Sequence, residues 1–336
     1  LYPITSFHDI NSKALSEGTF TLNMTTLLTD PSIFQIAAPV RAALNERNQA
    51  VVALESTLIT HGLPYPTNIE TALAMEAAIR ESGAIPATIG IIQGKIVVGL
   101  SLDQIEYLAQ ATSVRKCSRR DLAIAVGMKQ DGATTVAGTM IVAHKIGIHV
   151  FATGGIGGVH RGQPMDVSAD LIELGRTPIA VVCSGAKSIL DLPLTLEVLE
   201  TQGVPIIGLN TEMLPAFYTR STDLPIDAQV TTPQAAAAII HATHALDMKH
   251  GLLITVPVPA EDELSSEIAE AAIKQATQEA HDHALSGAKV TPYVLSRVAE
   301  LTEGASRRAN TSLLINNARV AATIAEALRQ IQDHAD

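Results

Sequence analysis

Short runs of Ala, Val, Ile and Leu recur along the 336-residue chain and alternate with stretches of helical spacing. Strands that helices cover on both faces carry such uniformly apolar runs, whereas half-exposed strands alternate apolar and polar residues. Strands that alternate with helices are typical of α/β proteins with a mostly parallel sheet. The predicted buried strands are residues 50–55, 149–153, 179–183, 204–209 and 252–257.

Helical spacing predicts the elements between and after these strands. The predicted helices are residues 33–47, 66–82, 101–111, 132–147, 194–201 and 233–248, then 261–286, 292–302 and 309–330 as a C-terminal helical layer. Residues 86–92 and 95–100 flank Gln93-Gly94, which is typical of a β-hairpin, and residues 56–65 are interpreted as a loop.

Two parts of the chain are distinguished by their pattern. We interpret residues 33–336 as a single α/β domain because no repeat or linker divides them. Residues 1–32 show no sustained period, and we interpret them as an N-terminal extension that can be disordered. Residues 1–23 are either a segment upstream of a start at Met24, a cloning remnant or a flexible arm.

The composition limits the partners. A formal net charge of -11 argues against nucleic acid or an anionic membrane as the main partner, but a local basic pocket can still bind an anionic small molecule. Two cysteines, Cys117 and Cys183, fit a reducing cytoplasm, where we expect the protein to act. We expect no membrane span and no secretory signal, because no apolar run is long enough for the first and no basic segment precedes one.

A glycine-rich loop, Thr153-Gly-Gly-Ile-Gly-Gly-Val-His-Arg161, follows one predicted strand. Glycines lack the Cβ atom that keeps a ligand from the backbone, so their N–H groups can face an anion. No Gly-Lys-Ser/Thr closes the loop, as a Walker A loop requires, and no helix begins after it, as the dinucleotide fingerprint requires. The loop therefore predicts an anion site, with a plain glycine-rich turn as the alternative.

Two ionisable residues follow other buried strands, at the edge of a sheet where ligands bind. Lys187 lies in an apolar neighbourhood, and desolvation favours the neutral amine that can form an imine with a carbonyl compound. Glu55 ends the first strand, where partial burial favours the protonated carboxyl group and suits it to proton donation. The alternatives are a surface Lys at a helix start and a carboxylate that caps the next loop or pairs with an Arg.

Further polar groups allow more than one interpretation. The cationic run Arg115-Lys-Cys-Ser-Arg-Arg-Asp121 can clamp a phosphate through Lys116, or it can form a solvated charged face. Asn310, Asn316 and Asn317 interrupt a stretch rich in Ala and Leu, although Asn is a poor helix former. Either one of them faces a polar ligand, or all lie on a helix surface.

Asp166 and Asp170 flank Ser168 with i,i+4 spacing. On the first turn of a helix this spacing would put both carboxylates on one face. Two carboxylates with few nitrogen ligands suit Mg²⁺ or Mn²⁺ held largely by water. The alternative is that Asp166 or Ser168 caps the helix, and one carboxylate can do each job.

Several motifs stand in order along the chain: Val52-Ala-Leu-Glu-Ser-Thr57, His61-Gly62, Lys116-Cys-Ser-Arg-Arg-Asp121, Gly132-Ala-Thr-Thr-Val136, Phe151-Ala-Thr-Gly-Gly-Ile-Gly-Gly-Val-His-Arg-Gly162 and Cys183-Ser-Gly-Ala-Lys-Ser-Ile-Leu-Asp191. Together they closely resemble the pseudouridine-5'-phosphate glycosidase family, also called the indigoidine synthase A-like family. The resemblance runs from about residue 33 to the C-terminus. It implies a three-layer α/β/α fold with a mostly parallel central sheet and extra C-terminal helices, and a homotrimer.

The resemblance also implies a reaction of pseudouridine catabolism: pseudouridine 5'-phosphate and water reversibly give uracil and ribose 5-phosphate. Ordinary glycosidases place two carboxylates around a C–O or C–N bond. A C-glycoside has no heteroatom leaving group to protonate, so the anomeric carbon needs an electron sink. An imine with Lys187 would supply one after sugar ring opening. The activity is a glycosidase activity, also called pseudouridylate synthase and classed as a carbon–oxygen lyase.

Site roles follow from the same resemblance. Glu55 matches the proton donor, Lys187 the nucleophile, and Asp166 the metal position, with one Mn²⁺ per subunit and Mg²⁺ or another divalent ion as alternatives. The positions that match substrate contacts are Lys116, Val136, Ser168, Ala169 and Asp170, and less closely His160 and Asn310. Two other functions stay open: a Schiff-base aldolase on another sugar phosphate, and a sugar-phosphate-binding protein without turnover.

Overall fold

The computed structural model describes residues 29–283, 285 and 290–334. The predicted extension, residues 1–32, therefore lies outside the described residues except for its last part, 29–32. The strands of the large sheet are β1 (Phe34–Ile36), β2 (Val51–Leu54), β3 (Ile85–Ile92), β4 (Lys95–Val98), β5 (Arg115–Cys117), β6 (Gly132–Thr134), β7 (Val150–Ala152), β10 (Ala180–Cys183), β12 (Ile206–Leu209), β13 (Ala228–Val230) and β14 (Leu252–Thr255). A small sheet contains β8 (Val159–His160), β9 (Gln163–Val167) and β11 (Leu190–Asp191).

The large sheet is mostly parallel, as predicted. Its strands follow the order β1-β4-β3-β2-β7-β10-β14-β12-β13, and β6 and then β5 branch from β3. Within the described residues, the pairs β3–β4 and β3–β6 are antiparallel and the other pairs of this sheet are parallel. The neighbours β2, β7 and β10 lie at its centre and run in one direction.

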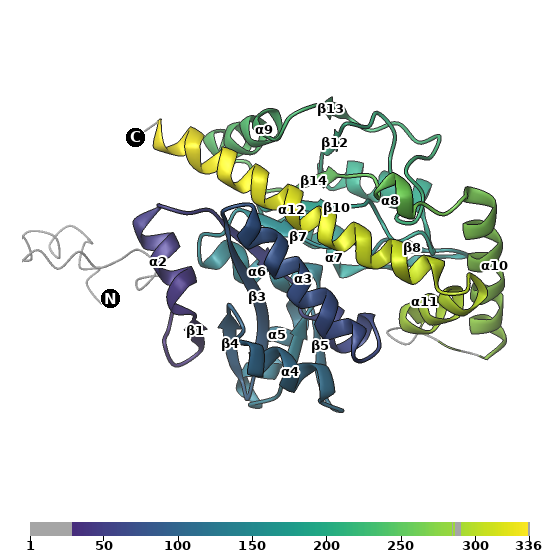
Figure 1. Ribbon diagram of the computed structural model, residues 1–336, viewed down its shortest axis with the longest axis horizontal. Coiled ribbons are helices and arrows are strands. Elements are labelled where there is room, and N and C mark those ends of the chain that lie inside the picture. Colours follow the sequence, from purple (N-terminus) through teal and green to yellow (C-terminus); the bar gives the residue numbers. More distant parts are fainter. Residues whose placement is uncertain (1–28, 284, 286–289, 335–336) are drawn as a thin grey trace, which may run out of the picture.

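Helices cover both faces of the sheet. The helices are α2 (Ala38–Glu46), α3 (Thr67–Glu81), α4 (Leu102–Gln110), α5 (Arg119–Gly127), α6 (Val136–Lys145), α7 (Ala169–Leu174), α8 (Leu192–Thr201), α9 (Pro233–Ala245), α10 (Ser266–Asp282), α11 (Val290–Leu301) and α12 (Ala305–Asp333), with short turns η1 (Leu58–Gly62) and η2 (Ala260–Asp262). Figure 1 shows α12 crossing in front of β7 and β10 between α3 and α9, with α6 and α7 behind the sheet. The predicted α/β/α architecture with extra C-terminal helices is confirmed.

The central strands are buried along their whole length, which explains their uniformly apolar sequences. Val52, Ala53, Phe151 and Val181 have no solvent exposure at all. Polar side chains therefore appear only where these strands end, and that edge becomes the place for a site. No helix within the described residues is long and apolar enough to cross a membrane.

Two local predictions are confirmed, the helix that begins after residue 101 and the hairpin around residues 93–94. Ser101 caps α4 with a capping box, in which the Gln104 N–H donates to Ser101 Oγ and the Gln104 side chain accepts from the Ser101 N–H. β3 and β4 form the predicted hairpin around Gln93 and Gly94, whose φ angles of 48° and 78° suit a tight turn.

Two predicted helices begin with a strand instead. Residues 33–47 split into β1, which pairs with the edge of β4, and α2, whose first turn holds Pro39. Residues 132–147 split into β6, which pairs with β3 and β5, and α6, which begins where the Thr135 hydroxyl accepts from the Gly138 N–H. Both strands are three residues long and gain their hydrogen bonds from distant parts of the chain, which a local pattern does not reveal.

Two segments for which the sequence predicts no helix or strand contain regular elements. The cationic run forms β5 and then the start of α5, where Asp121 at the third position accepts from the Ser118 N–H. The loop predicted at residues 56–65 contains the helical turn η1. In both segments a short element forms that neighbouring strands and helices hold in place.

Candidate active site

Two loops at the carboxyl ends of neighbouring strands form the floor of one pocket. Because β2, β7 and β10 are parallel neighbours, Glu55, the glycine loop and Lys187 open at the same edge. The Ile156 N–H donates to the Gly185 carbonyl and the Lys187 N–H donates to the Ile156 carbonyl, each at 3.1 Å. These bonds tie the two loops together.

The pocket gathers Glu55, Lys116, Lys187 and Asn310 from four separate elements. Glu55 follows β2, Lys116 belongs to β5, Lys187 follows β10 and Asn310 lies on α12. Residues of η1, the glycine loop and α11 complete the lining. An adjoining hollow of about 470 Å³ shares Asn310 and His61 with the pocket, which gives room for a nucleotide-sized ligand.

Two threonine hydroxyls hold the Glu55 carboxyl group. Thr153 Oγ1 donates to one carboxyl oxygen at 2.5 Å, and Thr57 Oγ1 donates to the other. Thr153 is almost completely buried, so its hydroxyl has a fixed position. The carboxyl group is therefore oriented from both sides, by its own loop through Thr57 and by the loop after β7 through Thr153.

The loop that carries Lys187 depends on close backbone approaches. Gly185 has a φ of 81°, and a Cβ atom there would lie 2.2 Å from the Pro215 carbonyl oxygen. Phe217 donates its N–H to the Ser184 carbonyl at 3.0 Å, which fixes the loop from the far side. Within the described part of the chain, the Lys187 ammonium group makes no hydrogen bond or ion pair. It is half-buried and faces the pocket.

Lys116 and His61 lie in an electrostatically positive part of the pocket. Burial lowers the pKa of Lys116, and Lys187 lowers it further, whereas Asp170 and Glu55 raise it. Burial and the nearby Lys116 also lower the pKa of His61, so its imidazole is neutral at neutral pH. Two amines that repel each other across a pocket favour a ligand with a doubly negative group.

Asp170 connects three backbone segments through its carboxylate and its own helix. Its Oδ1 accepts from the Ala137 N–H at 3.0 Å, at the start of α6, and its Oδ2 accepts from the Gly157 N–H at 2.9 Å. Its side chain is buried, and Gly157 must be glycine because a Cβ atom there would lie 2.8 Å from that carboxylate. Ser168 caps α7 by accepting from the Asp170 N–H at 3.2 Å, which confirms the capping alternative for Ser168.

The prediction that Asp166 and Asp170 share one helical face is wrong. Asp166 belongs to β9, which pairs with β8, and α7 begins only after Ser168. The side chain of Asp166 is 40% exposed, and its Oδ2 lies 2.8 Å from His160 Nδ1. The two carboxylates therefore have different surroundings, and only Asp166 has oxygen atoms open to solvent.

The surroundings of Asp166 fit a weakly caged divalent ion. Within the described residues, no three His, Cys, Asp or Glu side chains gather as a metal site. Mg²⁺ and Mn²⁺ are commonly bound through one or two carboxylates and keep several waters or substrate oxygens. One half-exposed carboxylate beside His160 suits that mode of binding, whereas a closed cage of protein ligands is not formed there.

The glycine loop offers fewer free N–H groups than the sequence predicts. The N–H groups of Ile156 and Gly157 donate to Gly185 and Asp170, and that of Val159 donates to Thr195 Oγ1 at 3.0 Å. The prediction of an anion cradle is therefore wrong for this part of the loop, because a carbonyl, a carboxylate and a hydroxyl group of the protein already accept these bonds. The glycines mainly permit close packing.

One of the three asparagines on α12 reaches the pocket and one holds its floor. Asn310 lines the pocket, whereas Asn317 is completely buried. Asn317 Nδ2 donates to the Thr153 carbonyl at 2.9 Å and to Ser184 Oγ at 3.1 Å. Asn317 thus joins the loop after β7 to the loop after β10.

The other predicted contact residues do not line this pocket. Val136 is the first residue of α6 and is buried, and Ala169 is the exposed first residue of α7. His160 lies on β8 beside Asp166, and Arg161 binds Glu270 of α10 through two hydrogen bonds of 2.9 and 3.0 Å. The structure does not test the roles predicted for these residues, which stay predictions.

Sequence reasoning missed four residues that shape the pocket: Thr57, Thr153, His61 as a lining residue, and Asn317 as a buried donor. The Thr153–Glu55 bond spans 98 positions, so no local pattern reveals it. The only available signal was that Thr57 and Thr153 each follow a buried strand, as Glu55 does.

A comparison with protein families matches residues 39–327 to the model described as indigoidine synthase A like protein. The chain belongs to this family. Relatives within it are similar over nearly their whole length. Pseudouridine-5'-phosphate glycosidase from Herpetosiphon aurantiacus is 54% identical over 297 residues, which are 88% of this chain and 98% of that protein. The enzyme of the same name from Geobacillus kaustophilus is 51% identical over 289 residues, with 85% and 96% covered.

Two solved structures have the same fold. The prealnumycin C-glycosynthase AlnA, in complex with ribulose 5-phosphate, superimposes with a TM-score of 0.83 at 40% identity, covering 91% of this chain and 100% of that one. An indigoidine synthase A-like protein from Thermotoga maritima superimposes with a TM-score of 0.81 at 33% identity, covering 88% and 97%. The family and the α/β/α fold are thus shown by sequence and by structure.

Proposed function

We propose that this protein reversibly cleaves the C–C glycosidic bond of pseudouridine 5'-phosphate to give uracil and ribose 5-phosphate, with Lys187 as the nucleophile and Glu55 as the proton donor. One observation carries the proposal. A lysine amine without a hydrogen-bond partner in the described residues and a carboxyl group held by two hydroxyls line one pocket. The names of the relatives from Herpetosiphon aurantiacus and Geobacillus kaustophilus support the choice of substrate.

The first step opens the ribose ring. Lys187 Nζ, as a neutral amine, attacks the anomeric carbon C1′, and the electron pair of the C1′–O4′ bond moves to O4′. Glu55 donates a proton to O4′, which becomes a hydroxyl group. Because Thr57 and Thr153 already hold the carboxyl group, little reorganisation is needed when the proton moves.

The second step releases uracil. The lysine nitrogen loses its extra proton and its lone pair forms the C1′=N bond. The C1′–C5 bond breaks, its electron pair stays with the uracil ring, and C5 takes up one proton. Water then adds to the imine, and collapse of the adduct restores the amine and leaves the aldehyde of ribose 5-phosphate. One water is consumed and no redox partner is needed.

We propose that Lys116 binds the substrate phosphate. Its ammonium group shares the pocket with Lys187, and a dianion there would offset the repulsion that lowers the pKa of Lys116. The substrate contacts implied for Val136, Ser168, Ala169, Asp170, His160 and Asn310 are part of the same proposal. The bonds of Asp170 to Ala137 and Gly157 favour an indirect role for this residue, in which it shapes the backbone beside the phosphate.

We propose a divalent ion, Mn²⁺ before Mg²⁺, at Asp166. Asp166 and His160 would hold it, together with water and substrate oxygens. When bound, the ion supplies positive charge that polarises substrate oxygens. Equilibrium dialysis of the free protein with Mn²⁺ tests this site: Asp166→Asn is expected to lose Mn²⁺ binding, and binding equal to that of the wild type would contradict the assignment.

A homotrimer that acts in the cytoplasm completes the proposal. The trimer rests on the resemblance to the family. The compartment is supported by Cys117 and Cys183, which are both buried free thiols. Sedimentation equilibrium of the purified protein tests the trimer, because a monomer or dimer at micromolar concentration would contradict it.

The reverse reaction provides the test of function. Uracil, ribose 5-phosphate and Mn²⁺ are incubated with the protein, and the C-glycoside product is measured by chromatography. Product is expected with the wild type and not with Lys187→Ala, whereas Glu55→Ala should lose most turnover and still bind ribose 5-phosphate. Lys274→Ala, an exposed lysine on α10, is the matched control and should keep full activity. Product from Lys187→Ala at the wild-type rate would contradict the mechanism.

A second candidate is the formation of a C–C bond to an acceptor other than uracil, because AlnA is a C-glycosynthase in its name and 40% identical. The same assay separates the two candidates. Uracil-dependent product supports the glycosidase. A sugar adduct on Lys187 without any uracil product favours another acceptor, and fragmentation of ribose 5-phosphate into shorter aldehydes identifies a Schiff-base aldolase.

A further inference from the structure

The turn that follows Lys187 determines where its amine can lie. The Leu190 N–H donates to the Lys187 carbonyl at 3.0 Å, and residues 188–190 are all buried. β11 begins at Leu190 and pairs with β8. The Lys187 ammonium group has no hydrogen-bond or ion-pair partner in the described part of the chain. Its position therefore depends on the backbone of this turn, residues 187–190.

Arg161 holds this turn through two of its carbonyl groups. Arg161 Nη2 donates to the Ser188 carbonyl at 2.7 Å, and Nε donates to the Leu190 carbonyl at 3.0 Å. The donors of a guanidinium group lie in one rigid plane, so a bond to each carbonyl fixes the orientation of both peptide groups. Both carbonyls belong to buried residues, where the loss of a donor costs free energy. The backbone next to Lys187 is therefore held by a side chain from outside its own loop.

Glu270 of α10 orients the Arg161 guanidinium. Glu270 Oε2 accepts from Nη1 at 2.9 Å, and Oε1 accepts from Nη2 at 3.0 Å. These hydrogen bonds lower the pKa of Glu270 and raise the pKa of Arg161, so both groups are charged at neutral pH. Because Nη2 donates to the Ser188 carbonyl as well as to Glu270, the ion pair sets the direction of a donor that binds the turn.

The same arginine lies between two further parts of the candidate site. Figure 1 shows α10 and α11 together beside β8, and residues of α11 line the pocket. Arg161 also directly follows His160, whose Nδ1 lies 2.8 Å from Asp166 Oδ2 at the proposed metal position. Arg161 is therefore placed where the turn after Lys187, the helix pair α10–α11 and the strand pair β8–β9 meet.

We propose that Arg161 is a positioning residue that directs the Lys187 amine at the anomeric carbon of the substrate, and that Glu270 holds Arg161 in the orientation this needs. This role rests on the proposed function, in which the amine attacks C1′. A displacement of about 1 Å between reacting groups can cost on the order of 100-fold in rate. The guanidinium acts through the Ser188 and Leu190 carbonyls and needs no contact with the substrate. The alternative is a purely structural role, in which Arg161 fastens α10 to the small sheet.

The rate of imine formation tests this role. The protein is mixed with ribose 5-phosphate, samples are quenched with borohydride at increasing times, and the adduct on Lys187 is quantified by peptide mass spectrometry. Arg161→Gln should lower the maximal rate by about 10- to 100-fold, whereas the ribose 5-phosphate concentration that gives half of this rate should change by less than about threefold. Arg161→Lys keeps the charge but lacks the planar fork, and should be nearly as slow. Glu270→Gln keeps one acceptor oxygen and should lose about two- to fivefold.

A rescue experiment and a matched control separate positioning from stability. In Arg161→Ala, guanidinium ion at concentrations far below those that denature proteins should restore part of the rate, because the ion can bind the same two carbonyls. Arg329→Gln is the control. Arg329 forms ion pairs with Glu326 and Asp333 near the other end of α12, and its variant should keep the wild-type rate at a temperature where it is folded. A purely structural role for Arg161 predicts the same result for Arg161→Gln.

A wild-type rate in folded Arg161→Gln overturns the proposal, and so does a slower rate that excess ribose 5-phosphate restores, because Arg161 would then serve binding. No adduct on Lys187 in the wild type would instead contradict the proposed function. Reductive methylation with formaldehyde needs no substrate and then still tests the position of the amine. Arg161→Gln should change the methylation rate of Lys187, relative to that of the exposed Lys274, by about threefold or more, and an unchanged ratio overturns the proposal.

Discussion

At the scale of single residues, two carboxyl groups of the site are held by hydrogen-bond donors that do not ionise. Glu55 has a threonine hydroxyl on each carboxyl oxygen, and Asp170 has a backbone N–H on each. Lys187 has no such partner in the described residues. The carboxyl group of Glu55, the proposed proton donor, is thus held in one orientation. The amine of Lys187, the proposed nucleophile, can move toward a ligand.

Thr153→Val tests the fixed carboxyl group. The substitution keeps the shape of the side chain and removes the hydroxyl that donates to Glu55 at 2.5 Å. The loss of one oriented hydrogen bond is expected to lower kcat by roughly 10- to 100-fold with little change in KM. Steady-state kinetics measure it, and Thr243→Val, a buried threonine on α9, is the control. A changed KM with an unchanged kcat would mean that Thr153 serves binding only.

Asp170→Asn tests the electrostatics of the phosphate position. Asp170 raises the pKa of Lys116, so removing its charge should lower that pKa further. Lys116 is charged only below its pKa, and ribose 5-phosphate binding should therefore be lost at a lower pH in the variant than in the wild type. The pH dependence of the ribose 5-phosphate dissociation constant measures this shift. Asp282→Asn, which changes an exposed aspartate on α10, is the control. If affinity is lost at the same alkaline pH in Asp170→Asn as in the wild type, the charge of Asp170 does not act on Lys116.

The sequence predicts the ionisable residues of the pocket better than their partners. Glu55 and Lys187 stand out because each ends an apolar run, where a charge is unexpected. Asp166 and Asp170 were placed on one helix because spacing alone cannot show that β9 extends to Val167 and Ser168 then starts α7. Of the hydroxyl and amide partners, Thr57 is local, but Thr153 follows β7 and Asn317 lies on α12, and such side chains are ordinary for buried positions.

At the scale of elements, α12 connects the two loops of the active site. The helix lies over β2, β7 and β10, and Asn317 on its buried face binds the Thr153 carbonyl and Ser184 Oγ. Thr153 in turn holds Glu55, and Ser184 begins the loop that carries Lys187. A single helix therefore sets the relative position of the proposed proton donor and nucleophile.

Asn317→Ala tests this connection. The variant leaves the buried Thr153 carbonyl without its amide donor, so the free energy of unfolding should fall by about 1–3 kcal/mol. Because both loops shift, kcat should decrease more than KM increases. Chemical denaturation and steady-state kinetics measure the two effects. The neighbouring Asn316→Ala is the matched control and should change stability by less than about 0.5 kcal/mol. Lost stability with unchanged kcat would make Asn317 purely structural.

Helices and strands could be predicted from the sequence where burial dictates the type of residue. Central strands such as β2 and β10 are recognisable because helices cover both faces and exclude polar residues. The short strands β1, β5 and β6 were missed because each gains its hydrogen bonds from distant parts of the chain. The sequences of β5 and β6, Arg-Lys-Cys and Gly-Ala-Thr, also do not favour a strand on their own.

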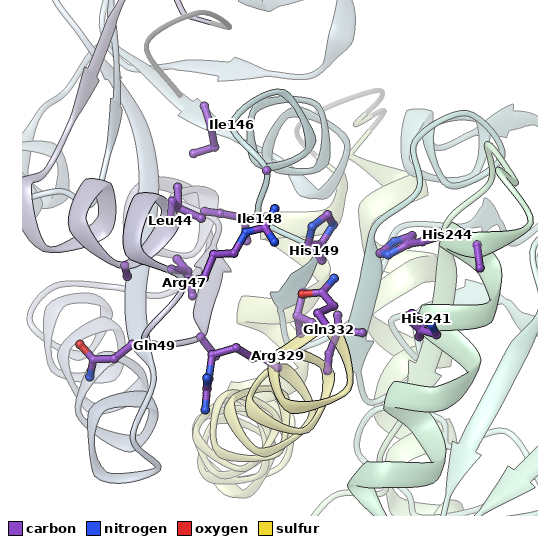
Figure 2. A pocket seen from close by; sticks show the side chains of 18 residues that line it. Leu44, Arg47, Gln49, Ile146, Ile148, His149, His241, His244, Arg329 and Gln332 are labelled. Carbon is purple, nitrogen blue, oxygen red and sulfur yellow. The ribbon is translucent and has the colours of Figure 1, made fainter. Parts of the chain in front are cut away.

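At the scale of the whole molecule, the parallel sheet has two different edges. The carboxyl ends of the central strands carry the candidate active site, and their amino ends border a second cavity of about 490 Å³ (Figure 2). Helix α12 spans both, with Asn310 at the pocket and Arg329 at the cavity. The rings of His149 and His244 line this cavity, and their centroids lie 4.7 Å apart.

His149 should make the stability of the molecule depend on pH. Its pKa is about 4 in the folded chain, below its usual value, so the unfolded chain binds the proton more readily. Above about pH 6.5 His149 has no effect on the free energy of unfolding. As the pH falls from there toward 4, His149 lowers the free energy of unfolding progressively, by on the order of 2 kcal/mol. Urea denaturation at pH 7 and pH 4.5 measures this. The wild type should lose more stability than His149→Gln; equal losses would contradict the assignment.

The central claim is that Lys187, rather than Lys116 in the same pocket, forms an imine with the sugar. Reduction with borohydride in the presence of ribose 5-phosphate traps such an imine as a stable secondary amine, which peptide mass spectrometry locates. We expect one sugar adduct on Lys187 in the wild type, and none in Lys187→Ala. No adduct in the wild type, or an adduct on Lys116, would contradict the account.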